Sequence, residues 1–410
     1  MKLEFTFDVV CPYAYLASTQ IEALAMHHNV EVTWKPVLLG GLFKHLDQPA
    51  RPADSWPRGK IEHNIRDLAR QAELLGVQLN PPPQHPRRTV EAMRLLVSVP
   101  PVNIPTLAHR LFAAYWQHGE DISDRKVLEA IASELGHDIQ AIDSESTRAE
   151  LHRRTQEAHE QGFFGVPTLS YSGDWWWGAD RLIHVEAALG SPTPPSTNAG
   201  KTGRRLRFFH DFSSPFSYLA STQIQRIAQR QGATVEYVPI LLGGLFRAIG
   251  TPMVPLFAMS EPRQAWMSRD MQNWARWWEV PLTFPSCFPL RTITPLRVSL
   301  VEPATIDALY RAAWVDDLDI GNETVLQSVL SKAGFDASAL LEAAQSAEIK
   351  AQLRQNTELA AHLGVCGVPT FEVDEGPLFW GQDRLHMVES ALAGWMPRID
   401  SERGPVGGSS

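Results

Sequence analysis

An apolar segment rich in Phe and Leu marks the start of each half of the chain, at residues 3–8 in the first half and at residues 206–211 in the second. Each is followed by a proline, Pro12 or Pro215, where an apolar helical periodicity begins. Proline suits a first helical turn because it lacks an amide hydrogen. The pattern therefore predicts that each half opens with a strand and then a helix.

The rest of each half follows one order of elements. Helices are predicted near 13–27 and 216–230, second strands near 31–37 and 234–240, and mostly helical segments over 55–160 and 258–362. A short strand, a turn and a final helix close each half. This order predicts an α/β fold of two tandem thioredoxin-like domains, each with a helical insertion.

The two halves are copies of one sequence. Residues 15–21 read YLASTQI and so do residues 218–224, an offset of 203. Three further blocks recur in the same order, beginning at Val37 and Ile240, Gly165 and Gly367, and Trp177 and Trp380. A period this long indicates domain duplication and not a solenoid. The expected boundaries are a first copy at 1–190, a Pro- and Ser-rich linker at 191–205, a second copy at 206–397 and a tail at 398–410.

Composition narrows the class of protein. The 410 residues carry a net charge of −9, which argues against a nucleic-acid partner. No apolar run approaches the ~20 residues that span a bilayer, and the N-terminus reads as a strand and not as a signal peptide. A cytoplasmic location is therefore expected, with Cys11, Cys287 and Cys366 as thiols, the last two buried, and no metal site.

The helix starts are the first candidate for chemistry. Cys11 precedes Pro12, and Ser214 precedes Pro215. Unpaired N–H groups and the helix dipole favour a thiolate there, whether it belongs to the protein or to a ligand. Two simpler interpretations stay open: Ser214 caps its helix, and Cys11 is a buried, inert thiol.

Two further pairs of motifs are candidates for chemistry. Val166-Pro167 and Val368-Pro369 precede predicted strands, where a cis proline exposes backbone groups to a peptide-like ligand. Asp180 and Asp383 follow Trp-Gly-x and fit a helix N-cap, a first-turn acid or a partner for a ligand's ammonium group. Trp175–Trp177 fit a strand better than a ligand cage.

Together these segments resemble the 2-hydroxychromene-2-carboxylate isomerases, which are relatives of kappa-class glutathione transferases and DsbA oxidoreductases. The resemblance rests on residues 211–220, 239–244, 270–281, 288–292, 367–371 and 379–385. It implies a glutathione site in which Ser214 holds the thiolate of glutathione and Cys11 takes that place in the first copy. The other positions that the resemblance implies for glutathione are Val368, Pro369, Gln382, Asp383, Asp270 and Arg263, with Val166, Pro167, Asp180, Lys60 and Asp67 in the first copy.

The implied activity is glutathione-dependent isomerisation of a conjugated, aromatic-derived acid by reversible thiolate addition, as in aromatic catabolism. Both copies lack the asparagine that the family often carries after the Gly-Gly-Leu-Phe block, and Cys11 has no second cysteine for a dithiol cycle. Three alternatives remain: a kappa-type transferase, a thiol oxidoreductase that uses Cys11, and a non-catalytic scaffold. Because the family commonly dimerises, the fused copies are expected to form an intramolecular pseudo-dimer.

Overall fold

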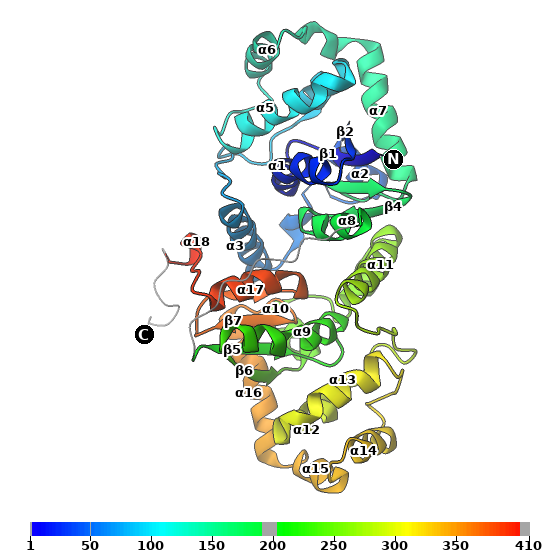
Figure 1. Cartoon of the computed structure of the whole chain (residues 1–410), viewed down its shortest axis with the longest axis vertical. Coiled ribbons are helices and arrows are strands. Elements are labelled where there is room, and N and C mark those ends of the chain that lie inside the picture. Colours follow the sequence, from blue (N-terminus) through cyan, green and yellow to red (C-terminus); the bar gives the residue numbers. More distant parts are fainter. Residues whose placement is uncertain (1, 50, 191–202, 402–410) are drawn as a thin grey trace. The chain divides into compact units, whose positions relative to one another are not determined.

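The computed structural model describes residues 2–49, 51–190 and 203–401 (Figure 1). The chain folds into two compact units. The first unit consists of Met1–Ser55, Ile65–Pro194 and Ser260–Arg263, and the second of Trp56–Asn64, Pro195–Met259 and Gln264–Ser410. Each unit comes mostly from one sequence copy. The first unit also includes Ser260–Arg263 of the second copy, and the second unit also includes Trp56–Asn64 of the first copy.

The first unit is built on a four-stranded sheet with the order β2-β1-β3-β4. Its strands are β1 (Lys2–Phe7), β2 (Glu31–Pro36), β3 (Thr168–Tyr171) and β4 (Asp174–Trp177). β1 pairs with β2 in parallel and with β3 antiparallel, and β3 pairs antiparallel with β4. The helices of this copy are α1 (Pro12–His27), α2 (Leu39–His45), α3 (Arg58–Leu74), α4 (Val90–Ser98), α5 (Ile104–Trp116), α6 (Arg125–Glu134), α7 (Glu145–Glu160) and α8 (Leu182–Ala188), with 3-10 helices η1 (Pro52–Ser55), η2 (Pro101–Asn103), η3 (Ile139–Asp143) and η4 (Ala179–Arg181).

The second unit repeats this plan with the order β6-β5-β7-β8. Its strands are β5 (Arg205–His210), β6 (Thr234–Pro239), β7 (Thr370–Val373) and β8 (Leu378–Trp380). The helices are α9 (Pro215–Gln231), α10 (Leu242–Ile249), α11 (Glu261–Trp277), α12 (Ile293–Val301), α13 (Ile306–Trp314), α14 (Glu323–Lys332), α15 (Ala337–Ala343), α16 (Ala347–Leu363), α17 (Leu385–Leu392) and α18 (Arg398–Ser401), with 3-10 helices η5 (Pro255–Ala258), η6 (Pro303–Thr305) and η7 (Gln382–Arg384). In Figure 1 the inserted helices α12 to α15 stand to one side of this sheet.

The apolar strands predicted from the sequence form the cores. Leu3, Phe5 and Phe7 alternate along β1 and are fully buried, and burial of each such side chain contributes about 1.5–3 kcal/mol. The inserted helices are tied to the strand-to-helix turn, because the indole nitrogen of Trp116 donates to Val9 O at 2.8 Å. Trp314 repeats this bond to Phe212 O at 2.7 Å, so the insert is anchored beside each turn.

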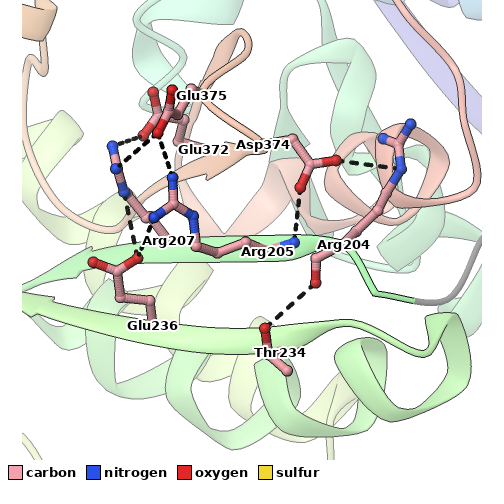
Figure 2. A network of polar contacts seen from close by, with 8 residues as sticks. All are labelled: Arg204, Arg205, Arg207, Thr234, Glu236, Glu372, Asp374 and Glu375. Atoms are coloured by element: carbon pink, nitrogen blue, oxygen red, sulfur yellow. Dashed lines mark hydrogen bonds and ion pairs between the residues drawn. The ribbon is translucent and has the colours of Figure 1, made fainter.

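An ion-pair network crosses the second sheet at the amino end of β5 (Figure 2). The Arg207 guanidinium lies 2.8 Å from Glu372 on β7 and 3.5 Å from Glu236 on β6. The register places Arg207 opposite both carboxylates. In the first sheet the corresponding residue is Glu4, which pairs with Lys35 at 2.6 Å on the neighbouring strand.

The predicted order of elements and fold class are confirmed: each copy is β-α-β, a helical insertion, then β-β-α. The predicted linker falls mainly on residues 191–202, outside the described residues. Part of the predicted tail is helical, since α18 spans Arg398–Ser401. No helix within the described ranges is long and apolar enough to cross a membrane.

Candidate active site

A buried aspartate holds each strand-to-helix turn. Asp8 accepts hydrogen bonds from Val10 N at 3.2 Å, Leu39 N at 2.9 Å and the Thr89 hydroxyl at 3.2 Å. Burial raises the pKa of Asp8 to about 6, although these three donors oppose the rise. The carboxylate therefore links the turn after β1 to the start of α2 and to the inserted helices.

Asp211 repeats this arrangement in the second copy. It accepts from Ser213 N at 2.9 Å and from Leu242 N at 2.8 Å, and burial raises its pKa. Sequence reasoning assigned no role to either aspartate. Their recurrence at an offset of 203, directly after a buried strand, is the signal that identifies them.

Cys11 lies at the N-cap of α1, as predicted. Its side chain makes no capping bond, and the Sγ donates to Val166 O at 3.1 Å. Burial raises the pKa of Cys11 to about 12, and the backbone N–H groups of Ala14 and Tyr13 only partly oppose this. The expectation of a stabilised Cys11 thiolate is therefore wrong, and the alternative of a buried, unreactive thiol fits.

Ser214 occupies the same position at the start of α9. Its Oγ accepts from Ser217 N at 3.1 Å, so the capping interpretation is correct. The same hydroxyl donates to Val368 O at 3.1 Å. The helix start and the residue before the second proline motif are thus in direct contact.

Both predicted proline motifs contain cis peptide bonds, at Val166-Pro167 and Val368-Pro369. Each lies directly before a strand, β3 or β7. The structure therefore brings together Cys11 with Val166, and Ser214 with Val368. The two resulting arrangements differ mainly in the atom at the helix start, sulfur or oxygen.

The two predicted aspartates lie in the first turns of 3-10 helices, Asp180 in η4 and Asp383 in η7. Neither is an N-cap, because glycine takes that position in both copies. Each forms an ion pair with the following arginine, at 3.0 Å in the first copy and 3.3 Å in the second. Gln382, before Asp383, is buried, and so is Ala179 in the first copy. Trp175–Trp177 lie in β4, as predicted.

The predicted charged residues of the inserted helices are divided between the units. Lys60 is in the second unit, with its ammonium group 4.3 Å from the Trp56 ring. Arg263 is in the first unit, with its guanidinium 5.6 Å from the Trp177 ring, and burial lowers its pKa. Arg263 and Ser214 thus belong to different units, and the assignment of Arg263 to the glutathione site stays a prediction.

Two acidic positions keep the expected helical placement. Asp67 on α3 is buried and accepts from Gln71 at 2.7 Å. Asp270 on α11 is also buried. Both side chains face protein and not open solvent.

The remaining cysteines are also free thiols. Cys366 is buried, as expected, and burial raises its pKa to about 11. Cys287 was expected to be buried, and that expectation is wrong because it is partly exposed. No cluster of three or more His, Cys, Asp or Glu side chains suited to a metal ion occurs in the part of the chain that the structure describes.

Similarity to known proteins covers each copy separately. A family model described as a DSBA-like thioredoxin domain matches residues 2–190 and again residues 205–393. A 2-hydroxychromene-2-carboxylate isomerase of Sphingobium xenophagum is 33% identical over 193 residues, which are 46% of this chain and 98% of that protein. Glutathione S-transferase kappa 1 of Caenorhabditis elegans is 27% identical over 48% of this chain and 94% of that protein. A solved 2-hydroxychromene-2-carboxylate isomerase structure covers 46% of this chain and 95% of its own, at 23% identity and a TM-score of 0.41.

Proposed function

This chain belongs to the DSBA-like thioredoxin domain family in both of its copies, and we propose that the Ser214 site is a glutathione-dependent isomerase site for a conjugated acid. The observation that carries the proposal is the Ser214 hydroxyl, held between Ser217 N and Val368 O at 3.1 Å each. A serine hydroxyl has one hydrogen to donate, so on ligand binding the Ser214 hydroxyl would leave Val368 O and donate to the thiolate instead. Relatives of this chain named isomerase and kappa transferase support the choice of ligand.

The residues at the helix start fit a thiolate. The first copy carries a sulfur at this point, Cys11 Sγ; burial raises the pKa of Cys11, and the N–H groups of Ala14 and Tyr13 act against that rise. The second copy has the same helix start with a serine, so the negative sulfur comes from the ligand. Charge-assisted hydrogen bonds of this kind are worth about 1.5–3 kcal/mol each.

Bound glutathione supplies a thiolate that adds reversibly to a conjugated double bond. The role of Ser214 is to donate a hydrogen bond to the sulfur while the α9 N-terminus stabilises its charge. Val368 offers backbone groups to the cysteine portion of glutathione. In this proposal Gln382 and Asp383, at the start of η7, bind the γ-glutamyl end, and the ion pair with Arg384 orients Asp383.

The alternative chemistries rank lower. A thiol oxidoreductase that uses Cys11 needs a thiolate, yet burial raises the pKa of Cys11 to about 12. A kappa-type transferase would use the same Ser214 site and would release the adduct instead of reversing it. The two activities are distinguished by whether glutathione is consumed.

The test is a calorimetric glutathione titration of the full-length chain together with turnover of 2-hydroxychromene-2-carboxylate. Ser214→Ala should weaken glutathione binding or turnover about 10- to 100-fold, which corresponds to the loss of one charge-assisted bond. Ser346→Ala is the matched control, because it removes the N-cap of α16, where Ser346 accepts from Ile349 N at 3.3 Å. Absence of glutathione binding by the wild-type chain, or equal effects of the two variants, would refute the proposal.

A further inference from the structure

The first unit contains a cavity of about 250 Å³ beside β2, which is an outermost strand of its sheet. The cavity is lined by residues of β2, η2, the start of α5 and α7, together with Thr6 of β1 and Phe163. The residues that line it differ from the predicted site residues of this copy, so it is a separate space. Ligand pockets span about 300–1,000 Å³, so this cavity suits a ligand smaller than a typical cofactor.

The walls of the cavity are largely apolar. Trp34 and Phe163 line it and are only 4% and 3% exposed, and Val37 and Ile104 line it as well. A hydrocarbon group gains free energy when it leaves water for such walls. The apolar part of a ligand therefore has a place here.

Two cations that line the cavity keep unused hydrogen-bond donors. The Lys35 ammonium lies 2.6 Å from Glu4, and the Arg154 guanidinium gives its Nε–H to Glu150 at 2.7 Å. Among the described residues these bonds use one of the three N–H groups of Lys35 and one of the five of Arg154. The other N–H groups of both side chains remain for a ligand.

The remaining charged side chains at the cavity neutralise one another. Glu157 pairs with Arg153, which also pairs with Glu150 at 2.8 Å. With Glu4, the carboxylates in and around the cavity therefore balance its lysine and two arginines. The cavity thus offers an anion N–H donors and not a net positive field. Charge-assisted hydrogen bonds of this kind are roughly twice as strong as neutral ones.

The second copy fills the same place with apolar side chains. At the offset of 203, Thr6 and Lys35 correspond to Phe209 and Val238. Phe209 is fully buried and belongs to one apolar cluster with Val238 and Val365. The cavity therefore comes from residues in which the two copies differ, and not from the scaffold that they share.

The position of Arg154 differs in the same way. In the second copy Asn356 takes this position, one residue out of phase. Asn356 is buried and donates to Pro239 O at 3.1 Å, so its amide serves the protein interior. The free N–H donors thus occur in the copy that has the cavity.

The geometry points to a binding site in the first unit for a small organic anion with a short aliphatic chain. The anionic group accepts hydrogen bonds from Lys35 and Arg154, and the chain lies against Trp34 and Phe163. A water molecule occupies about 30 Å³, so the cavity has room for roughly eight non-hydrogen atoms, the size of hexanoate. This site is independent of the proposed function at Ser214.

The test is a ligand-observed NMR titration of the full-length chain with hexanoate and, in parallel, with 1-hexanol, which keeps the chain and lacks the charge. Hexanoate should bind with a Kd on the order of 1 mM and at least 10-fold more tightly than 1-hexanol. Arg154→Gln should weaken hexanoate binding about 10-fold, the loss of one charge-assisted hydrogen bond, and leave 1-hexanol binding unchanged. Arg148→Gln is the matched control and should change neither, because Arg148 is an ion-paired arginine of α7 that does not line the cavity.

A second variant, Thr6→Phe, installs the residue of the second copy and fills the cavity. Hexanoate binding should fall more than 10-fold in this variant, and the Arg154→Gln result decides alone if Thr6→Phe does not fold. Three results would overturn the inference: no hexanoate binding by the wild-type chain, equal affinities for hexanoate and 1-hexanol, or equal effects of Arg154→Gln and Arg148→Gln. Unchanged hexanoate binding by folded Thr6→Phe would also overturn it, because the ligand would then lie elsewhere.

Discussion

A fully buried histidine in the second sheet gives the chain a specific dependence on pH. His210 at the end of β5 has no solvent exposure, and its Nδ1 lies 3.0 Å from the Tyr310 hydroxyl. Burial lowers the pKa of His210 to about 3, so the imidazole is neutral in the folded protein at pH 5 to 7. In the first copy the corresponding residue is Phe7, which packs on Phe112 at 5.7 Å.

The sign follows from proton binding. Between pH 6.5 and pH 3 the unfolded chain binds a proton at this histidine and the folded chain does not, so the free energy of unfolding falls as the pH falls. The stability that the neutral His210 side chain contributes is fully present above pH 6.5 and is lost progressively as the pH falls to 3. With pKa values of 6.5 unfolded and about 3 folded, the loss between pH 7 and pH 5 is about 2 kcal/mol, and the whole loss is about 5 kcal/mol.

The perturbation is His210→Phe, which installs the residue of the first copy. Urea unfolding of the full-length chain at pH 7, 6 and 5, followed by hydrogen exchange of β5 peptides, reports the stability of the second unit separately. The stability of wild type relative to His210→Phe should fall by about 2 kcal/mol from pH 7 to pH 5. Phe371→Leu, on the adjacent β7, is the control, and its effect should not change with pH. A constant difference between wild type and His210→Phe would refute the reasoning.

Two further predictions concern the site and its thiols. Gly381→Ala should weaken glutathione affinity at least 10-fold, because a Cβ there meets the Asp383 carboxylate and the backbone φ is 109°. Gly394→Ala is the control: its φ is also positive, at 110°, but a Cβ there meets open space, so the affinity should be unchanged in the same titration. With iodoacetamide at pH 8, the partly exposed Cys287 should be alkylated about 100-fold faster than the buried Cys11. Peptide mass spectrometry measures the two rates. Faster labelling of Cys11 would contradict the raised pKa of its thiol.

The elements of the fold were predictable because their signals are local. Apolar strands followed by Pro12 or Pro215 mark the helix starts, and the repeat supplies every prediction twice. The helix starts and the proline motifs were singled out from the sequence, but the contacts of Cys11 with Val166 and of Ser214 with Val368 were found only in the structure.

The errors concern quantities that depend on distant parts of the chain. The pKa of Cys11 is set by the burial of its sulfur, and no feature near Cys11 in the sequence gives that burial. Asp8 acts through Leu39 and Thr89, which lie 31 and 81 residues away.

The ion pairs of the second sheet bear on how a duplicated chain avoids exchanging strands between its copies. At equivalent register positions Arg207 lies opposite Glu236 and Glu372, whereas Glu4 lies opposite Thr33 and Ser170. A hybrid sheet with β1 between β6 and β7 would place three carboxylates side by side. The reverse hybrid would leave Arg207 facing two hydroxyl groups, and a half-buried charge without its partners costs several kcal/mol. Charge at one register position therefore lets β1 and β5 each recognise the strands of their own copy while the chain folds.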